Sequence, residues 1–117
     1  MTRDDADTLC AALPGATAAH PPELVSWKVG GKMFACFGGD REMNGVSVKT
    51  DSIETAAMLI DASTATRAPY FHRSWVRLPF QATDINEARH RIHVSYDIIR
   101  KSLRRADRDA LPAREAS

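Results

Sequence analysis

The chain has 117 residues, 44% of them hydrophobic and 26% charged, with a formal net charge of +1. This length suits one domain, and the balance of apolar and charged residues excludes a disordered chain. The apolar runs are too short for a transmembrane helix, and the charged start Met1–Asp5 does not resemble a signal peptide. We therefore expect one cytoplasmic domain over residues 1–108 and a disordered tail over 109–117.

The charges are distributed unevenly along the chain. Residues 1–66 carry five basic and nine acidic side chains, a net of −4, whereas residues 67–108 carry ten basic and four acidic ones, a net of +6. A total charge near zero argues against a strongly electrostatic nucleic-acid binder. The basic second half nevertheless favours a local positive surface.

The first third of the chain predicts a helix followed by a hairpin. A capping box of Thr2 with Asp5 and apolar residues at helical spacing predict the helix. These apolar residues are Ala6, Leu9, Cys10 and Leu13. After a loop containing proline, alanine and histidine, alternation predicts strands over 24–29 and 32–37. Gly30-Gly31 joins the strands, since glycine readily takes the positive φ angles of a two-residue turn.

The middle of the chain predicts a third strand and a second helix. Gly38-Gly39-Asp40 opens a polar loop, after which Val46 and Val48 alternate with Ser47 and Lys49 in a strand. Asp51 with Glu54 gives a capping pattern for the helix. Its buried stripe is predicted to be Ile53, Ala56, Ala57 and Ile60.

The last part predicts a second hairpin and the longest helix. Short strands are expected over 67–71 and 75–78, joined by His72-Arg73-Ser74, with Pro69 confining the first strand to an edge or a bulge. The helix begins at Asp84, with Glu87 three residues later, and one narrow face carries its apolar residues. They are Ile85, Ala88, Ile92, Tyr96, Ile99 and Leu103.

The predicted order of elements is αβββαββα, with neighbouring strands joined by short turns. Such connections favour an antiparallel sheet with helices packed on one face. The fold class expected from the sequence is therefore a two-layer α+β domain.

Several segments together resemble the MmcQ/YjbR family. Residues 27–35, Trp-Lys-Val-Gly-Gly-Lys-Met-Phe-Ala, look like the hairpin signature of that family. The strand and helix start at 46–51, the hairpin segments 68–71 and 75–78, and Leu13-Pro14-Gly15 are similar too. The likeness covers about residues 5 to 105. Two segments depart from the family pattern: 62–67 is shorter than in many relatives, and His72-Arg73-Ser74 replaces a turn containing asparagine and lysine.

The resemblance implies a fold similar to the frataxin homologue CyaY with two hairpin "wings", and a DNA-binding function. Basic residues on both hairpins and on one flank of the last helix are then candidates for contacts with the phosphate backbone of duplex DNA. The candidates are Lys28, Lys32, Arg73, Arg77, Arg100 and Arg104. The alternative for the helix residues is a solvated border whose stems cover apolar surface. The aromatic residues of the strands are expected in the core rather than on a base-stacking surface.

A rival function of another class is a non-catalytic module that binds a protein or a small ligand and never contacts nucleic acid. Such a module would use the sheet face or the groove between the hairpins. An exposed apolar patch would favour this hypothesis, whereas a continuous positive surface would favour DNA.

Metal binding and catalysis receive less support from the sequence. His90, His93 and Asp97 share a helix face, but arginines surround them and a structural zinc site needs four ligands. The acidic residues Asp4, Asp5 and Asp7 resemble the acidic first helix of frataxins, yet a helix N-terminus favours acidic residues for dipole reasons alone. No nucleophile motif or phosphate-binding loop is present, so we predict no enzyme activity, no metal and no cofactor. Cys10 and Cys36 are expected to be buried free thiols.

Overall fold

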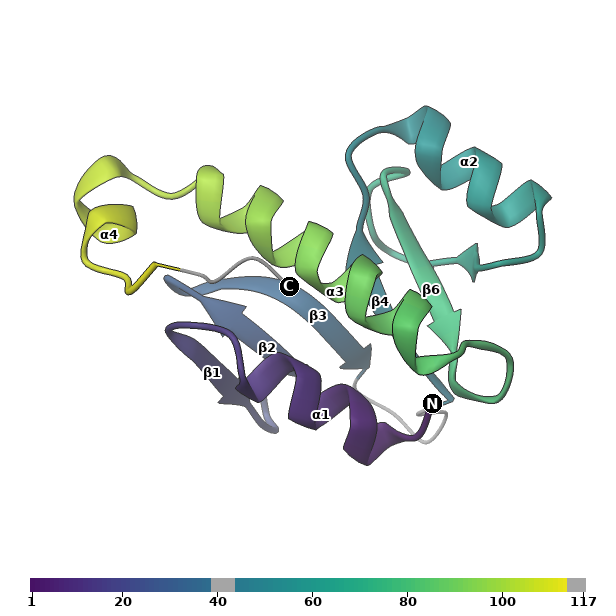
Figure 1. The fold of residues 1–117 in the computed structure, drawn as a ribbon, viewed down its shortest axis with the longest axis horizontal. Helices are drawn as coiled ribbons and strands as arrows, with labels where there is room; N and C mark the ends of the chain where they lie inside the picture. The colour runs from purple at the N-terminus through teal and green to yellow at the C-terminus, as the bar shows by residue number, and fades with distance from the viewer. Residues whose placement is uncertain (39–43, 114–117) are drawn as a thin grey trace.

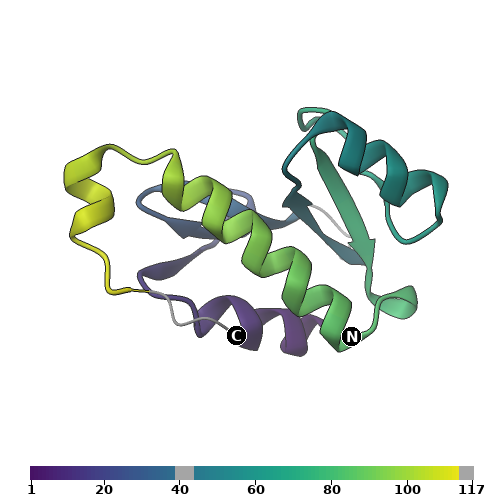
Figure 2. The same cartoon turned by 45° about the horizontal axis from the view of Figure 1, so that its top comes forward.

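A computed structural model describes residues 1–38 and 44–113. It contains an antiparallel six-stranded sheet in the order β1-β2-β3-β4-β6-β5, which confirms the predicted α+β class. The strands are β1 (Ala16–Ala19), β2 (Val25–Val29), β3 (Lys32–Gly38), β4 (Gly45–Lys49), β5 (Thr66–Arg67) and β6 (Trp75–Pro79). The helices are α1 (Arg3–Ala11), α2 (Ile53–Asp61), α3 (Ile85–Lys101) and α4 (Arg105–Asp109), with a short 3-10 helix η1 (Phe80–Ala82). α1 and α3 contact each other and lie over the same side of the sheet (Figure 1, Figure 2).

The hairpin of β2 and β3 forms as the glycine pair predicts. Gly30 has φ +57° and Gly31 has φ +81°, and the two strands pair from Val29 with Lys32 onward. Gly30 also lies against the helix layer, since a Cβ atom there would be 2.6 Å from a methyl carbon of Leu103. The turn therefore needs glycine at this position for both its backbone angle and its contact.

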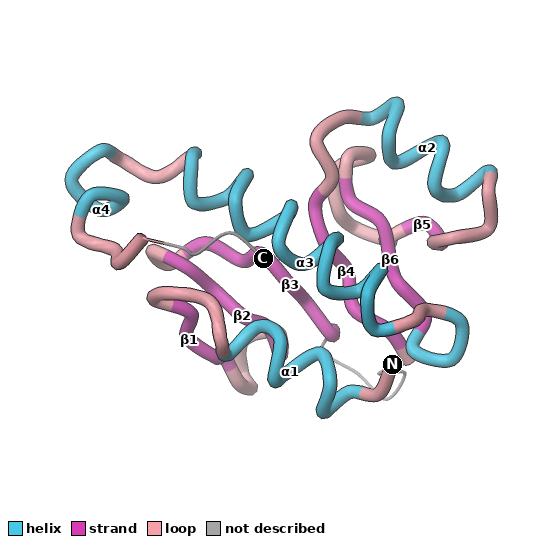
Figure 3. The backbone as a smooth tube through the Cα atoms, in the orientation of Figure 1, coloured by secondary structure: helices cyan, strands magenta, loops and turns pink. Residues whose placement is uncertain are grey.

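Two strands differ from the prediction. β1 was expected to be a loop, because alanine, proline and histidine are poor strand formers, yet it pairs with β2 along its whole length. The strand predicted over 67–71 is wrong in extent, since β5 covers only Thr66–Arg67 (Figure 3). Tyr70 has φ +71°, a left-handed angle that no extended strand contains, so the chain turns away from the sheet after Ala68.

The core lies between the sheet and the helices as one cluster of buried side chains. Within it, Phe34 of β3 and Tyr96 of α3 meet edge to face, with ring centroids 5.3 Å apart. The Tyr96 hydroxyl donates to the carbonyl oxygen of Pro14 at 2.6 Å, so the phenol reaches a partner from inside the core. The predicted α3 stripe is confirmed at Ala88, Ile92, Tyr96, Ile99 and Leu103, but Ile85 at its start is 37% exposed.

α2 exposes most of the stripe predicted for it. Ala56 and Leu59 are buried, whereas Ile53, Ala57 and Ile60 are exposed. α2 packs mainly against β5 and β6 at one end of the sheet, so a narrow face of the helix suffices to cover them. Its N-cap is Ser52, whose hydroxyl accepts from the backbone N–H of Thr55, and not Asp51 as the Asp51/Glu54 pattern predicts.

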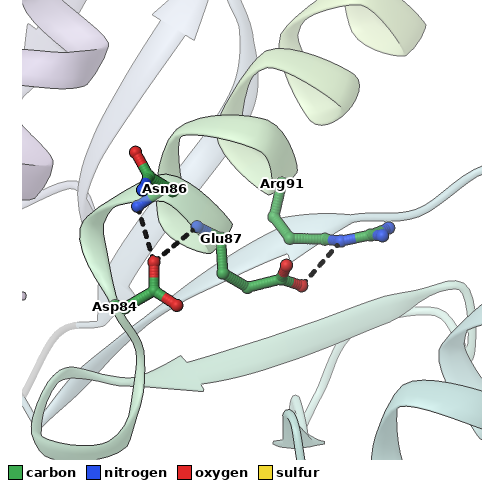
Figure 4. Close-up of polar contacts among 4 residues, drawn as sticks. All are labelled: Asp84, Asn86, Glu87 and Arg91. Atoms are coloured by element: carbon green, nitrogen blue, oxygen red, sulfur yellow. Dashed lines mark hydrogen bonds and ion pairs between the residues drawn. The ribbon is translucent and has the colours of Figure 1, made fainter.

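The caps of α1 and α3 follow the sequence. The capping box of α1 forms in both directions between Thr2 and Asp5. At α3 the Asp84 carboxylate accepts from the backbone N–H groups of Asn86 and Glu87, and Glu87 forms an ion pair with Arg91 one turn later (Figure 4). These contacts fix the start of the helix that covers the centre of the sheet.

The C-terminal part of the described chain packs back onto the domain. α4 was not predicted, and the tail expected over 109–117 starts inside it. Leu111 packs against the core cluster, and its carbonyl oxygen accepts a hydrogen bond from Arg100 at 3.4 Å. Residues 114–117 and the polar-loop residues Gly39 and Asp40 lie outside the described part of the chain.

Candidate functional site

One row of side chains, small except for Arg77, crosses the sheet on the face away from the helices. In strand order β2-β3-β4-β6-β5, neighbouring Cα positions pair as Ser26, Cys36, Ser47, Arg77 and Thr66. The adjacent row contains Ala35, Val48 and Val76, which belong to the core beneath the helices. Because side chains alternate along a strand, the first row must point to the opposite side, which we call the open face.

The open face is hollowed into a pocket of about 730 Å³. Its floor contains Cys36 and Ser47, which are 1% and 2% exposed, so the middle of the sheet carries only small groups here. Bulkier apolar side chains form the walls. They are Leu24, Met33, Pro69, Phe71 and Pro79, whereas the Phe37 ring packs in the core against Arg3 of α1. A smaller hollow of about 360 Å³ adjoins it and shares Leu24 and Met33. The open face therefore carries the apolar concavity that the sequence associates with the rival, ligand-binding hypothesis.

Arg77 is held over the pocket by three oxygen atoms. Its Nη1 donates to the Ser47 hydroxyl at 3.1 Å, its Nη2 to the Phe37 carbonyl at 3.0 Å and its Nε to the Asn44 side-chain oxygen at 3.3 Å. All three acceptors are uncharged. These bonds fix the plane of the guanidinium group. Arg67, on the edge strand, is the second charged residue among the described residues that line the pocket.

The Cys36 thiol lies on the floor of the pocket, and the nearby Arg77 affects its pKa. Burial raises the pKa of the thiol above its ordinary value, and a backbone hydrogen bond from Gly38 and the nearby Arg77 offset part of the rise. The thiol is therefore neutral at physiological pH. It contributes a small, weakly polar surface rather than a thiolate nucleophile.

The loop over residues 68–74 borders the pocket, and its residues Tyr70 and Phe71 form what we call the aromatic rim. The rings of Phe71 and Trp75 stack with centroids 4.6 Å apart. Tyr70 is fully exposed and has φ +71°, an angle that is unfavourable for an aromatic residue. A strained, exposed tyrosine at the mouth of a pocket is a feature that strand alternation does not predict.

A polar cluster fixes the same loop to β4. The buried Ser74 hydroxyl accepts from Lys49 Nζ at 2.7 Å and lies 2.8 Å from His72 Nδ1. The Ser74 carbonyl accepts from both the backbone N–H and the hydroxyl of Thr50. His72 Nδ1 also accepts a hydrogen bond from the backbone N–H of Ser74, so the cluster holds the loop in place.

Three of the six predicted DNA contacts lie in or beside the open face. Arg77 lines the pocket, and Lys28 lines the adjoining hollow, where it forms an ion pair with Glu23. Arg73 is exposed in the loop next to the aromatic rim, and it has no hydrogen bond or ion pair to another described residue.

The other three gather at the opposite layer, around the C-terminal end of α3. Lys32 Nζ donates to the carbonyl and hydroxyl oxygens of Ser102, and Arg100 donates to the Tyr96 hydroxyl and Leu111. Arg104 forms an exposed ion pair with Asp107. The six residues therefore divide into two groups, one on each layer of the fold.

Sequence reasoning missed Arg67 and Tyr70 as pocket residues. Both fall in the segment predicted as a regular strand, where alternation places aromatic side chains in the core. The pattern did contain one usable signal. Cys36 follows Ala35 on β3, and Ser47 lies between Val46 and Val48 on β4, which indicates small side chains on one face in the middle of the sheet.

In residues 1–38 and 44–113, no group of three or more His, Cys, Asp or Glu side chains is placed to hold a metal ion. Within the same residues, no helix combines the length and hydropathy needed to cross a bilayer.

Comparisons with known proteins agree with the fold. The model of the YjbR family matches residues 11–98. A crystal structure of the Deinococcus radiodurans protein DR2400, with the family domain DUF419, is similar with a TM-score of 0.78 and 22% sequence identity; the alignment covers 92% of this chain and 86% of that one. No curated protein matches the chain. Because the family model spans well over half of the sequence, this chain belongs to the YjbR family.

Proposed function

We propose that this protein is a binding module, not an enzyme, that holds a small ligand in the pocket on its open face. The pocket itself is the observation that carries this proposal: about 730 Å³ is within the range of small-molecule sites in proteins. Mainly apolar walls surround a few fixed polar groups, which is the usual composition of such sites.

The surroundings of the pocket support a preformed site. Its floor belongs to the central strands β3 and β4, and the loop beside it is anchored through Ser74 to Thr50 and Lys49. Arg77 is oriented by three hydrogen bonds before any ligand arrives. A site whose polar groups are already ordered loses little conformational entropy on binding.

The proposal is tested with the neutral fluorescent probe phenylnaphthylamine, which brightens when it leaves water. The matched variants are Leu24→Lys at the pocket and Ile85→Lys at the start of α3, because both residues are partly exposed apolar side chains. Loss of one apolar contact should weaken binding by roughly fivefold in Leu24→Lys. Ile85→Lys should bind like the unchanged protein. Absence of binding, or equal losses in both variants, would reject the pocket as the site.

Weak binding of duplex DNA through the open face is the second candidate function. The observation in its favour is that Lys28, Arg67 and Arg77 share this face and that Arg73 is exposed beside it. The contacts expected from Lys32, Arg100 and Arg104 lie on the other layer, so one duplex meets only the open-face group at a time.

Fluorescence anisotropy with a labelled duplex of mixed sequence, measured across a salt series, tests this second function. Phosphate contacts predict affinity that falls steeply with salt and decreases in Arg73→Ala/Arg77→Ala. The matched control is Arg104→Ala/Arg105→Ala, which removes the same charge from exposed ion pairs with Asp107 and Asp109. Equal weakening in both double variants would mean that only total charge matters.

A further inference from the structure

We propose that the exposed side of α2 is a docking surface for an amphipathic helix of a partner protein, one whose apolar stripe is bordered by lysine or arginine. α2 lies at one end of the fold (Figure 1, Figure 2) and contributes none of the described residues that line the pocket. The inference therefore goes beyond the proposed function and does not depend on it. Three features carry it: an uncovered apolar stripe, the spacing of that stripe, and the charges beside it.

The first feature is the apolar surface of α2 that the fold leaves uncovered. Ile53 and Ile60 are 43% and 37% exposed, Ala57 between them is exposed, and Met58 is 60% exposed. The opposite side of the helix already packs in the core cluster, so these side chains are not needed to close the core. Apolar surface of this kind is favoured to leave water when another surface covers it.

The second feature is the spacing of this surface. Ile53, Ala57 and Ile60 are at positions i, i+4 and i+7 of α2, so they form one row along the helix. Such a row packs into the groove of another helix, and the alanine in its middle lets the two helix axes come close. Apolar anchors at these intervals are typical of helices that bind other proteins. The row therefore fits a helix of the partner.

The third feature is the sign of the charge beside the row. Glu54 and Asp61 are both exposed, and α2 carries no basic side chain. Neither carboxylate has a hydrogen bond or ion pair with another described residue. Glu54 in the first turn is favourable for the helix dipole, but Asp61 in the last turn is not, because the C-terminal end of a helix favours a cation. The stability of the isolated helix does not account for an acidic residue at this position.

These charges decide between the possible occupants of the surface. In a second copy packed through its own α2, carboxylates would meet carboxylates, which is unfavourable. Nucleic acids and anionic lipid surfaces are repelled for the same reason. A partner helix with lysine or arginine beside its apolar stripe brings a cation close to Asp61 and to the C-terminal end of α2, and both attract it.

The test measures the binding of three labelled model peptides by fluorescence anisotropy. The first peptide contains leucine and lysine in a pattern that gives a helix one apolar stripe. The second has glutamate in place of each lysine, and the third has the composition of the first in an order without a stripe. The lysine peptide with the stripe should bind about tenfold more tightly than either of the others, because it alone matches both the row and the charges.

An apolar double variant locates the contact. Ile53→Ser/Ile60→Ser should weaken the binding of the lysine peptide about tenfold, since two apolar side chains are lost from the row. The matched control is Leu24→Ser/Ile85→Ser, which shortens two partly exposed apolar side chains outside α2 and should bind the peptide like the unchanged protein. Urea denaturation of both variants shows that they are folded under the conditions of the titration.

A charge variant provides a second readout that leaves the apolar row intact. Glu54→Gln/Asp61→Asn should weaken the lysine peptide about threefold in low salt and less in high salt, because exposed charges are screened. The matched control is Asp107→Asn/Asp109→Asn on α4, which removes the same charge from an exposed part of the fold. This control should retain the affinity of the unchanged protein.

The possible results either support or overturn the inference. Absence of binding, or equal binding of the three peptides, would overturn it. Equal losses in the α2 variants and their controls would place the binding elsewhere and would also overturn it. A dimer of the unchanged protein in sedimentation that Ile53→Ser/Ile60→Ser dissociates would identify a second copy as the occupant in place of a basic helix.

Discussion

Arg77 and Ser47 are direct cross-strand neighbours on β6 and β4, and the guanidinium Nη1 of Arg77 donates to the Ser47 hydroxyl at 3.1 Å. The bond connects the cationic group of the open face to the floor of its pocket. Ser47 is 2% exposed, so its hydroxyl accepts the hydrogen bond from Arg77 at the floor of the pocket. The position of the charge therefore depends on the strand register as well as on the arginine itself.

This relationship predicts a specific effect of Ser47→Ala. Loss of the hydroxyl removes one of the three described hydrogen bonds that orient Arg77 and leaves its Nη1 without this acceptor, so the free energy of unfolding should fall by about 1 kcal/mol. Urea denaturation measures this. Unchanged stability of the variant would contradict a structural role for the bond.

A second prediction concerns Ser95, which joins two strands of the sheet. Its hydroxyl donates to the Phe34 carbonyl at 2.6 Å and accepts the backbone N–H of Lys49 at 2.9 Å. Ser95→Ala leaves both backbone groups without this partner, so the free energy of unfolding should fall by about 1 to 3 kcal/mol. Urea denaturation measures this, with Ser102→Ala on the exposed end of α3 as the control. A loss no greater than that of the control would contradict the bridging role.

The hairpin turn provides a matched pair of glycine substitutions. A Cβ atom at Gly31 meets no other atom within 4 Å, so Gly31→Ala incurs only the strain of its positive φ, about 1 to 2 kcal/mol. At Gly30 the Cβ atom also approaches Leu103 to 2.6 Å, so Leu103 must move. Gly30→Ala should therefore destabilise the protein more than Gly31→Ala in thermal unfolding. Equal losses would mean that Leu103 adapts without cost.

Cys10 predicts how stability changes at high pH. Burial raises the pKa of its thiol far above the ordinary value of 9.0, so the folded protein keeps the proton while the unfolded chain loses it. The unfolded state then binds fewer protons above that ordinary value, and the free energy of unfolding falls as pH rises. Cys10→Ala should show a shallower decline than the unchanged protein between about pH 8 and pH 10. Parallel declines in urea denaturation would assign the pH dependence to other groups.

Local patterns predict the elements that depend on short-range chemistry. The Thr2/Asp5 capping box, the Asp84 cap and the Gly30-Gly31 turn form as their sequences indicate, because each is determined within a few residues. β1 was missed because it is held by pairing with β2, a contact between segments that alanine propensity does not reveal. The stripe of α2 was wrong for a similar reason, since the partner of a helix decides which face is covered.

The candidate site was only partly predictable. Lys28 and Arg77 could be selected as basic residues near hairpins, and both lie on the open face. Lys32, Arg100 and Arg104 were grouped with them, although hydrogen bonds and an ion pair hold them near the end of α3. Charge along a sequence does not state which layer a side chain occupies. The pocket also needs the departure of the chain at Tyr70, and its left-handed angle has no signature in the surrounding residues.

The central claim is that the open face holds the ligand. Amide proton–nitrogen correlation spectra of the labelled protein, titrated with phenylnaphthylamine, test this claim most directly. We predict that the largest shifts occur in the strands of the pocket floor and in the rim loop. The residues concerned are Cys36, Phe37, Ser47, Tyr70, Phe71 and Arg77. Shifts concentrated on α1, α3 or the exposed face of α2, with the pocket residues unchanged, would contradict the account.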